Sequence, residues 1–162
     1  MAFRTHLLVV ANQTADSPEL IEALNQRSAQ SPIHVTLLVP STYSERAEAN
    51  ARIQTAKAML SESGIEAEGL LGDADPIVAV QEAWHPGRYD EVVVSTLEEG
   101  ASRWLQVDLP HRVAKLTDCT VRHVAVPVRR VTPKAPEPPP TPKPLLESAL
   151  GLLRSSTRGR EA

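Results

Sequence analysis

Two hydroxyl side chains, Ser95 and Thr96, directly follow the apolar segment Val92–Val94. A short run of β-branched, uncharged residues is typical of a buried strand. In an open α/β sheet, ligands bind beyond the carboxyl ends of the strands, where the strand order reverses. Hydroxyl groups both donate and accept hydrogen bonds, which suits a polar ligand. We therefore expect any small-molecule site of this chain to include Ser95 and Thr96.

The segment after this strand carries four more side chains that could bind an anion, namely Ser102, Arg103, His111 and Arg112. Hydroxyl groups and a helix start provide hydrogen-bond donors, and the two arginines provide positive charge. The alternative is that Ser102, like Asp108, only caps a helix and that the arginines are solvated. Both interpretations stay open at this point.

Three other side chains invite a chemical interpretation, and each has a simpler structural one. His111 could act as an acid or base, but no nucleophile motif or metal-ligand spacing accompanies it. Trp104 could stack on an adenine, or belong to a lid of apolar side chains over the end of the sheet. Cys119 begins a buried strand and is better explained as a small apolar residue than as a redox group. The remaining histidines, at positions 6, 34, 85 and 123, show no metal-ligand spacing.

The elements that must position these residues follow from the apolar pattern and the turn signals. The predicted strands are His6–Ala11, Ile33–Val39, Ile65–Leu71, Tyr89–Thr96 and Thr120–Val128. The predicted helices start at Pro18, span Tyr43–Ser63, start at Pro76, form a short turn at Ser102–Gln106 after Gly100, and start after a cap at Asp108.

Strands that alternate with helices imply a parallel sheet with right-handed crossovers. The expected fold is an α/β three-layer sandwich around a five-stranded parallel sheet of order 3-2-1-4-5. In this order the first and fourth strands are neighbours, so Asn12 should lie near Ser95 and Thr96. Our candidate ligand-binding residues are Asn12, Val39, Ser95, Thr96, Ser102 and Arg103.

The composition changes near residue 129. Residues 1–128 hold 10 Lys and Arg against 17 Asp and Glu, whereas residues 129–162 hold 7 against 3. We predict one domain over 1–128, a Pro-rich linker over 129–144, and a short amphipathic helix with a disordered basic tail over 145–162. The acidic domain argues against a nucleic-acid-binding face.

The rest of the composition limits the class of protein. One cysteine excludes an internal disulfide, and the absence of a long apolar run excludes a membrane span. No signal-peptide pattern precedes the first strand, so we expect a cytoplasmic protein.

The layout resembles the universal stress protein family, an adenine nucleotide alpha hydrolase-like fold. The resemblance rests on the run Leu71–Pro76, the following helix, the strand entry Tyr89–Val94, and the ending Cys119–Pro127. The chain departs from the family's ATP-binding pattern, Gly-x-x-Gly, nine residues, then Gly-Ser/Thr, and it has Asn12 where the family has Asp. It is therefore similar to a branch that lacks the glycine-rich loop.

The resemblance implies a non-catalytic regulatory or interaction module linked to stress, homodimeric through the last strand, Val121 to Val128. The exposed edge of that strand favours the same dimer. The alternative is a protein that binds ATP or AMP through an atypical loop, and a small hydrolase is a third hypothesis. The amphipathic segment Leu145 to Leu153 could contact a protein partner.

Overall fold

The computed structural model describes residues 3–98 and 102–128. The chain divides into two units, Met1–Val128 and Arg129–Ala162, and all described residues belong to the first. The predicted linker over 129–144, the helix and tail over 145–162, and Gly100 lie outside the described residues. These expectations remain predictions.

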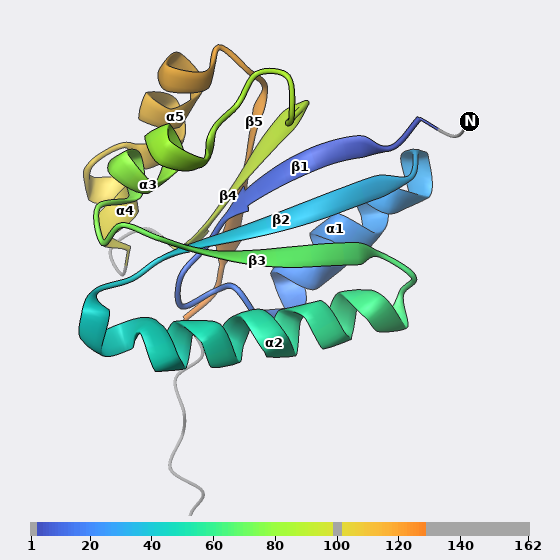
Figure 1. Cartoon of the computed structure of the whole chain (residues 1–162), viewed down its shortest axis with the longest axis horizontal. Helices are drawn as coiled ribbons and strands as arrows, with labels where there is room; N and C mark the ends of the chain where they lie inside the picture. The colour runs from blue at the N-terminus through green and yellow to red at the C-terminus, as the bar shows by residue number, and fades with distance from the viewer. Residues whose placement is uncertain (1–2, 99–101, 129–162) are drawn as a thin grey trace, which may run out of the picture. The chain divides into compact units, whose positions relative to one another are not determined.

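Strands and helices alternate along the described chain (Figure 1). The strands are β1 (Thr5–Val10), β2 (Ile33–Pro40), β3 (Glu66–Gly72), β4 (Glu91–Leu97) and β5 (Val121–Val126). The helices are α1 (Pro18–Gln30), the 3₁₀ turn η1 (Tyr43–Glu45), α2 (Arg46–Glu62), α3 (Pro76–Ala83), α4 (Arg103–Gln106) and α5 (Leu109–Thr117).

The five strands form one parallel sheet in the order β3-β2-β1-β4-β5, as the sequence predicted. β1 lies between β2 and β4, with Val10 opposite Leu38 on one side and Val94 on the other. From β1 the chain adds β2 and β3 on one side of the sheet, and then β4 and β5 on the other side. The carboxyl ends of β1 and β4 therefore mark the point where the strand order reverses.

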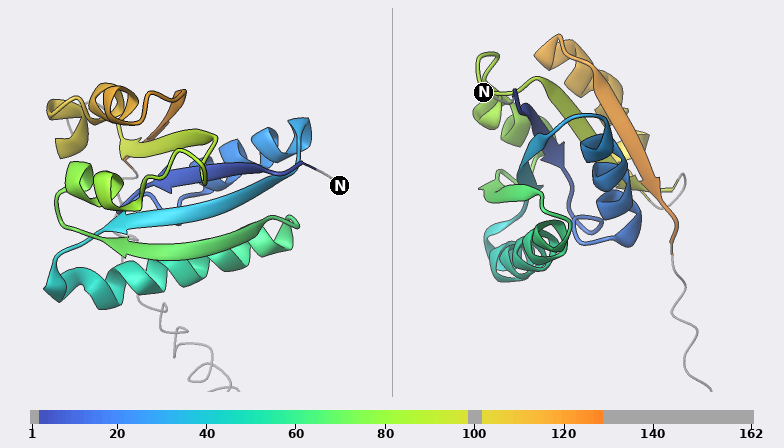
Figure 2. Two further views of the ribbon diagram at one scale, coloured as in Figure 1. Left: turned by 45° about the horizontal axis from the view of Figure 1, so that its top comes forward. Right: turned by 90° about the vertical axis from the view of Figure 1, so that its right-hand side faces the viewer.

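Helices cover both faces of the sheet and complete three layers (Figure 2). The first core lies between the sheet and the helices α1 and α2, and the second lies under α3 and α5. Alternate residues of β1 point into the two cores, with Leu7 and Val9 in the first and Leu8 and Val10 in the second. An unbroken apolar run such as β1 is what a strand covered on both faces requires.

Local signals explain where the helices begin and end. Ser17 and Asp75 cap α1 and α3, since their side chains accept hydrogen bonds from the backbone N–H groups of Leu20 and Ile77. Proline occupies the start of both helices, where its missing N–H is not needed. Gly64 follows α2 with a φ of 75°, a left-handed conformation that favours glycine at this position.

Three sequence expectations need correction. Asp108 occupies the cap position of α5 but adopts a left-handed conformation, with a φ of 53°, and its side chain makes no capping hydrogen bond. Tyr43–Glu45 forms a 3₁₀ turn instead of the first turn of α2. β5 ends at Val126, before the predicted Val128, because Pro127 has no N–H to continue the ladder.

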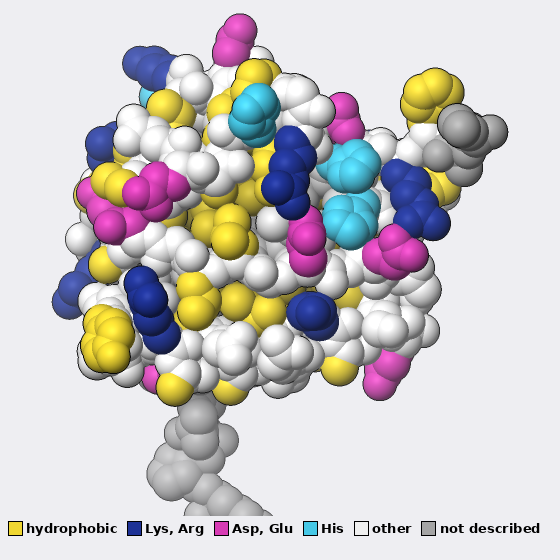
Figure 3. Space-filling view, in the orientation of Figure 1, with side chains coloured by type: hydrophobic (Ala, Val, Ile, Leu, Met, Phe, Trp, Pro, Cys, Tyr) yellow, Lys and Arg dark blue, Asp and Glu magenta, His cyan; other side chains and the backbone are white. Residues whose placement is uncertain are grey.

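α3 and α5 pack on one face of the sheet. On this face, no described helix covers the amino ends of β1, β2 and β3 (Figure 1). Charged and histidine side chains gather there instead (Figure 3). They are His6 and His34, whose ring centroids lie 5.4 Å apart, with Glu66, Glu68 and Arg88. Among the described residues, no helix is long and apolar enough to cross a membrane.

Candidate functional site

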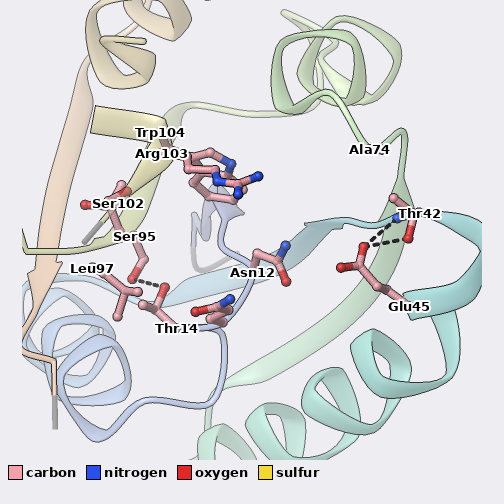
Figure 4. Close-up of a pocket in the computed structure, with 12 residues that line it drawn as sticks. Asn12, Thr14, Thr42, Glu45, Ala74, Ser95, Leu97, Ser102, Arg103 and Trp104 are labelled. Carbon is pink, nitrogen blue, oxygen red and sulfur yellow. Dashed lines mark hydrogen bonds between the residues drawn. The ribbon is translucent and has the colours of Figure 1, made fainter. Parts of the chain in front are cut away.

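A cavity of about 530 Å³ opens at the carboxyl ends of β1 and β4. The end of β4, the start of α4, and the loops that follow β1, β2 and β3 supply its walls (Figure 4). Its lining residues are Asn12, Gln13, Thr14, Thr42, Glu45, Ala74, Ser95, Thr96, Leu97, Ser102, Arg103 and Trp104. The volume is in the range of small-molecule sites, roughly 300–1,000 Å³.

The two hydroxyls that end β4 are buried and point to opposite faces of the sheet. The Ser95 hydroxyl donates to Thr14 Oγ1 at 2.8 Å, and both side chains are nearly inaccessible. Thr96 Oγ1 lies 2.7 Å from Nε2 of His123, a residue of β5 on the same face. Each hydroxyl therefore already has one partner inside the protein, and Ser95, whose hydrogen goes to Thr14, keeps only lone pairs.

Asn12 forms the floor of the cavity between β1 and α1. Its Oδ1 accepts a hydrogen bond from Arg52 Nη1 of α2 at 3.2 Å. Arg52 also forms an ion pair with Glu48 one helical turn away. The hydrogen bond from Arg52 fixes the orientation of the Asn12 amide through its oxygen. The NH₂ group of Asn12 is then free to donate to a ligand.

A carboxylate stands on the wall formed by η1. Glu45 accepts hydrogen bonds from the Thr42 hydroxyl at 2.7 Å and the Thr42 backbone N–H at 3.0 Å. These bonds lower the pKa of Glu45 below its ordinary value, so the cavity has a negative charge on this side at neutral pH. Sequence reasoning missed both residues, although Thr-x-x-Glu spacing is the signature of a capping box.

The opposite wall begins with Ser102, whose hydroxyl accepts the Leu105 N–H and caps α4. The next two residues face the cavity, and Arg103 points into it (Figure 4). Arg103 is exposed and forms no ion pair with any described residue. Trp104 is half-buried against the second core, as expected for an apolar lid, and also lines the cavity.

The structure brings together five of the six candidate ligand residues, namely Asn12, Ser95, Thr96, Ser102 and Arg103. Val39 is the exception. It is fully buried in the first core because odd-numbered positions of β2 face α1 and α2. His111 and Arg112 also lie outside the cavity lining, since Leu109 and Val113 bury the opposite face of α5.

Cys119 has the structural role that the sequence suggested, whereas His123 takes part in a contact that the sequence did not suggest. Cys119 packs against the second core and its Sγ donates to the Asp90 carbonyl oxygen. Burial raises the pKa of this thiol, which suits a structural residue. His123 contacts the cavity through Thr96, a pairing that depends on the register of β5 and has no sequence signal. Within residues 3–98 and 102–128, no three His, Cys, Asp or Glu side chains gather as metal ligands.

No protein-family model matches the chain, and no curated protein matches it in sequence. Solved structures do match. A universal stress protein in complex with cAMP has a TM-score of 0.56 at 18% identity, over 77% of this chain and 98% of that protein. A universal stress protein from Archaeoglobus fulgidus has a TM-score of 0.54 at 14% identity, over 75% and 94%.

A third match is a universal stress protein family protein from Arabidopsis thaliana with AMP bound. Its TM-score is 0.51 at 15% identity, over 82% of this chain and 98% of that protein. At these identities the likeness is one of fold, and it spans nearly the whole of each matched protein. The strand order and the motifs around Leu71–Pro76 agree with it. The chain therefore has the fold of the universal stress proteins.

Proposed function

We propose that this protein is a non-catalytic regulatory module that binds an adenine nucleotide with a single phosphate in the cavity at the carboxyl edge of its sheet. The observation that carries the proposal is the cavity itself, about 530 Å³ in volume and lined by hydroxyls and Arg103 at the switch point of the sheet. Proteins of this fold that bind AMP or cAMP support the choice of ligand.

Arg103 and the neighbouring hydroxyls suit the phosphate. Arg103 has no anionic partner among the described residues, and a guanidinium binds phosphate oxygens with two parallel hydrogen bonds. The Thr14 hydroxyl, which accepts from Ser95, keeps its own hydrogen to donate to a phosphate oxygen, and Thr96 also lines the cavity.

Glu45 and Asn12 suit the sugar and the base. A carboxylate opposite the phosphate side can accept from the hydroxyls of a ribose, as acidic residues do in dinucleotide sites. The free NH₂ of Asn12 can donate to a ring nitrogen, and Trp104 offers an apolar surface for the adenine.

The charge of the lining supports a monophosphate over a triphosphate. Among the described lining residues Arg103 is the one cation, and Glu45 is an anion across the cavity. A triphosphate carries several negative charges, and the described walls offer one charge to neutralise them. We therefore expect AMP and cAMP to bind more tightly than ATP.

Thermal unfolding with AMP, cAMP, ATP and adenosine tests the proposal. A ligand at 100 times its Kd adds about 2.7 kcal/mol to the free energy of unfolding and raises Tm by several degrees. We expect this shift with AMP and cAMP, a smaller one with Arg103→Ala, and an unchanged one with Arg112→Ala, which alters an exposed arginine outside the cavity. No shift with any nucleotide overturns the proposal, and conversion of the ligand to product overturns its non-catalytic part.

We also propose that two copies pair through β5. β5 is the last strand of the sheet, so one row of its backbone groups has no partner strand among the described residues. The carbonyl of Thr120 accepts from Val92 of β4, and that of Val126 accepts from Glu98, the residue after β4. The backbone groups of Ala125, one residue before Val126, therefore point away from β4.

Ala125→Pro should therefore block pairing between copies without removing a hydrogen bond from the sheet. We expect a dimer in sedimentation velocity at micromolar concentration for the unmodified chain, and a monomer for this variant. A monomer in both, or a dimer in both, contradicts pairing through β5.

A further inference from the structure

His123 reaches the cavity from the edge strand through one hydrogen bond. Its Nε2 lies 2.7 Å from Oγ1 of Thr96, which lines the cavity and is only 2% exposed. His123 itself is exposed and lies opposite Val94 in the register of β4 and β5. The imidazole is therefore open to solvent protons while its partner hydroxyl borders the ligand space.

The direction of this hydrogen bond determines what Thr96 offers a ligand. A hydroxyl has one hydrogen and two lone pairs. In the neutral tautomer that carries its hydrogen on Nδ1, Nε2 of His123 accepts the Thr96 hydrogen, so only lone pairs remain for the ligand, and these repel an anion. A protonated imidazole has N–H groups at both nitrogens, so Thr96 must accept from it, and the hydroxyl hydrogen becomes free to donate to the ligand.

We propose that His123 is a positioning residue that makes the cavity selective for anions, because its protonated form turns the Thr96 hydroxyl toward the ligand as a donor. This inference rests on the proposed function, since it assigns a specificity determinant to the same site. The protonated imidazole also adds positive charge behind Thr96, next to a cavity that Arg103 already lines.

No described acidic side chain neutralises a protonated His123, so a bound anionic ligand is the group that can do so. Three elements pack against β5, namely β4, α5 and α1. The ionisable side chains of these elements are Glu91 of β4, His111, Arg112 and Lys115 of α5, and Glu19, Glu22 and Arg27 of α1. Glu91 is held by Arg27, α5 contributes only basic groups, and no ion pair joins His123 to a described acidic residue.

The reciprocal effect follows from linkage. If a protonated His123 strengthens anion binding, then a bound anion must favour protonation of His123 by the same factor. Two independent measurements can therefore test one relationship, and the second needs no variant.

The first measurement is the Kd of cAMP by titration calorimetry between pH 5.5 and 8.0. A phosphodiester has one negative charge throughout this range, so the ligand itself does not titrate. We expect binding to weaken about tenfold as the pH rises, a typical size for coupling between two sites. His123→Gln should remove the pH dependence, His111→Gln should retain it, and neutral adenosine should show none.

The second measurement follows the imidazole resonance of His123 by NMR in the unmodified protein. We expect the midpoint of its titration to move to higher pH when cAMP is added. Binding of cAMP with the same pH profile in the protein and in His123→Gln, or an unmoved midpoint, overturns this inference alone. If no nucleotide binds at any pH, the proposed function and this inference fail together.

Discussion

At the scale of single residues, Gly69 lies in β3 where α2 crosses it, directly under the side chain of Ile53. A Cβ at this position would stand 2.2 Å from Ile53 Cγ2, closer than packed atoms tolerate. We expect Gly69→Ala to lower the free energy of unfolding by about 1–3 kcal/mol, the usual cost of overpacking a core. Gly87→Ala is the matched control, since nothing lies within 4 Å of its Cβ position. Urea unfolding measures both, and equal losses would contradict this packing.

The stability of the folded protein should depend on pH through the carboxyl group of Glu68. Partial burial raises its pKa, but hydrogen bonds from Thr36 at 3.0 Å and Arg88 at 2.8 Å outweigh it, so the net pKa is below the ordinary value. A carboxyl whose pKa is lowered by folding stabilises the protein above its unfolded pKa, and that contribution is lost as the pH falls through the folded pKa.

Thermal unfolding between pH 6 and pH 3 should therefore show a smaller loss of Tm in Glu68→Gln than in the unmodified protein. Glu62→Gln, on the exposed side of α2, is the control and should follow the unmodified curve. A steeper acid loss in Glu68→Gln would mean that its carboxylate does not favour the folded state.

The sequence analysis predicted some of the residues that line or contact the cavity and missed others. Ser95, Thr96 and Asn12 were predictable because they follow strands whose apolar pattern is clear. Val39 faces the first core and lies outside the cavity lining, because the face of a strand depends on register, which a run that is apolar on both faces does not reveal. His123 joins the cavity only through the pairing of β4 with β5, so no local pattern could have found it.

At the scale of elements, two aspartates occupy similar positions before helices but differ in what they do. Asp75 Oδ1 accepts the Ile77 N–H at 2.8 Å and caps α3. Asp108 precedes α5 in a left-handed conformation without a capping bond. We expect Asp75→Ala to cost about 1 kcal/mol, the usual value of a cap.

Asp108→Gly should be neutral or stabilising, because glycine adopts a positive φ without steric cost. Chemical unfolding measures both variants. A loss in Asp108→Gly as large as that in Asp75→Ala would show that the Asp108 side chain has a stabilising partner.

The elements themselves were largely predictable. Each of the five expected strands is present, and α2 buries one stripe of side chains, Ala49, Ile53, Ala56 and Leu60. These long periodic segments bury one face, and burial is what their pattern encodes. The boundaries were less predictable, because η1 and the end of β5 depend on local backbone geometry and on Pro127.

At the scale of the whole described unit, strand order creates the cavity. Residues from five separate segments, between Asn12 and Trp104, meet because parallel strands present their carboxyl ends at one edge of the sheet. The fold could be predicted from the alternation of strands and helices together with the resemblance to universal stress proteins. Part of the chemistry of the cavity could not, since His123 reaches it only through the pairing of β4 with β5.

The most direct test of nucleotide binding at this edge is a ¹⁵N–¹H NMR titration of the full chain with AMP. Binding in the cavity predicts saturable shifts of the backbone amides at residues 12–14, 95–97 and 102–104, with little change in the exposed half of β3. Arg103→Ala should weaken the titration without moving its location. An unchanged spectrum at millimolar AMP, or shifts confined to another surface, would contradict a nucleotide site in this cavity.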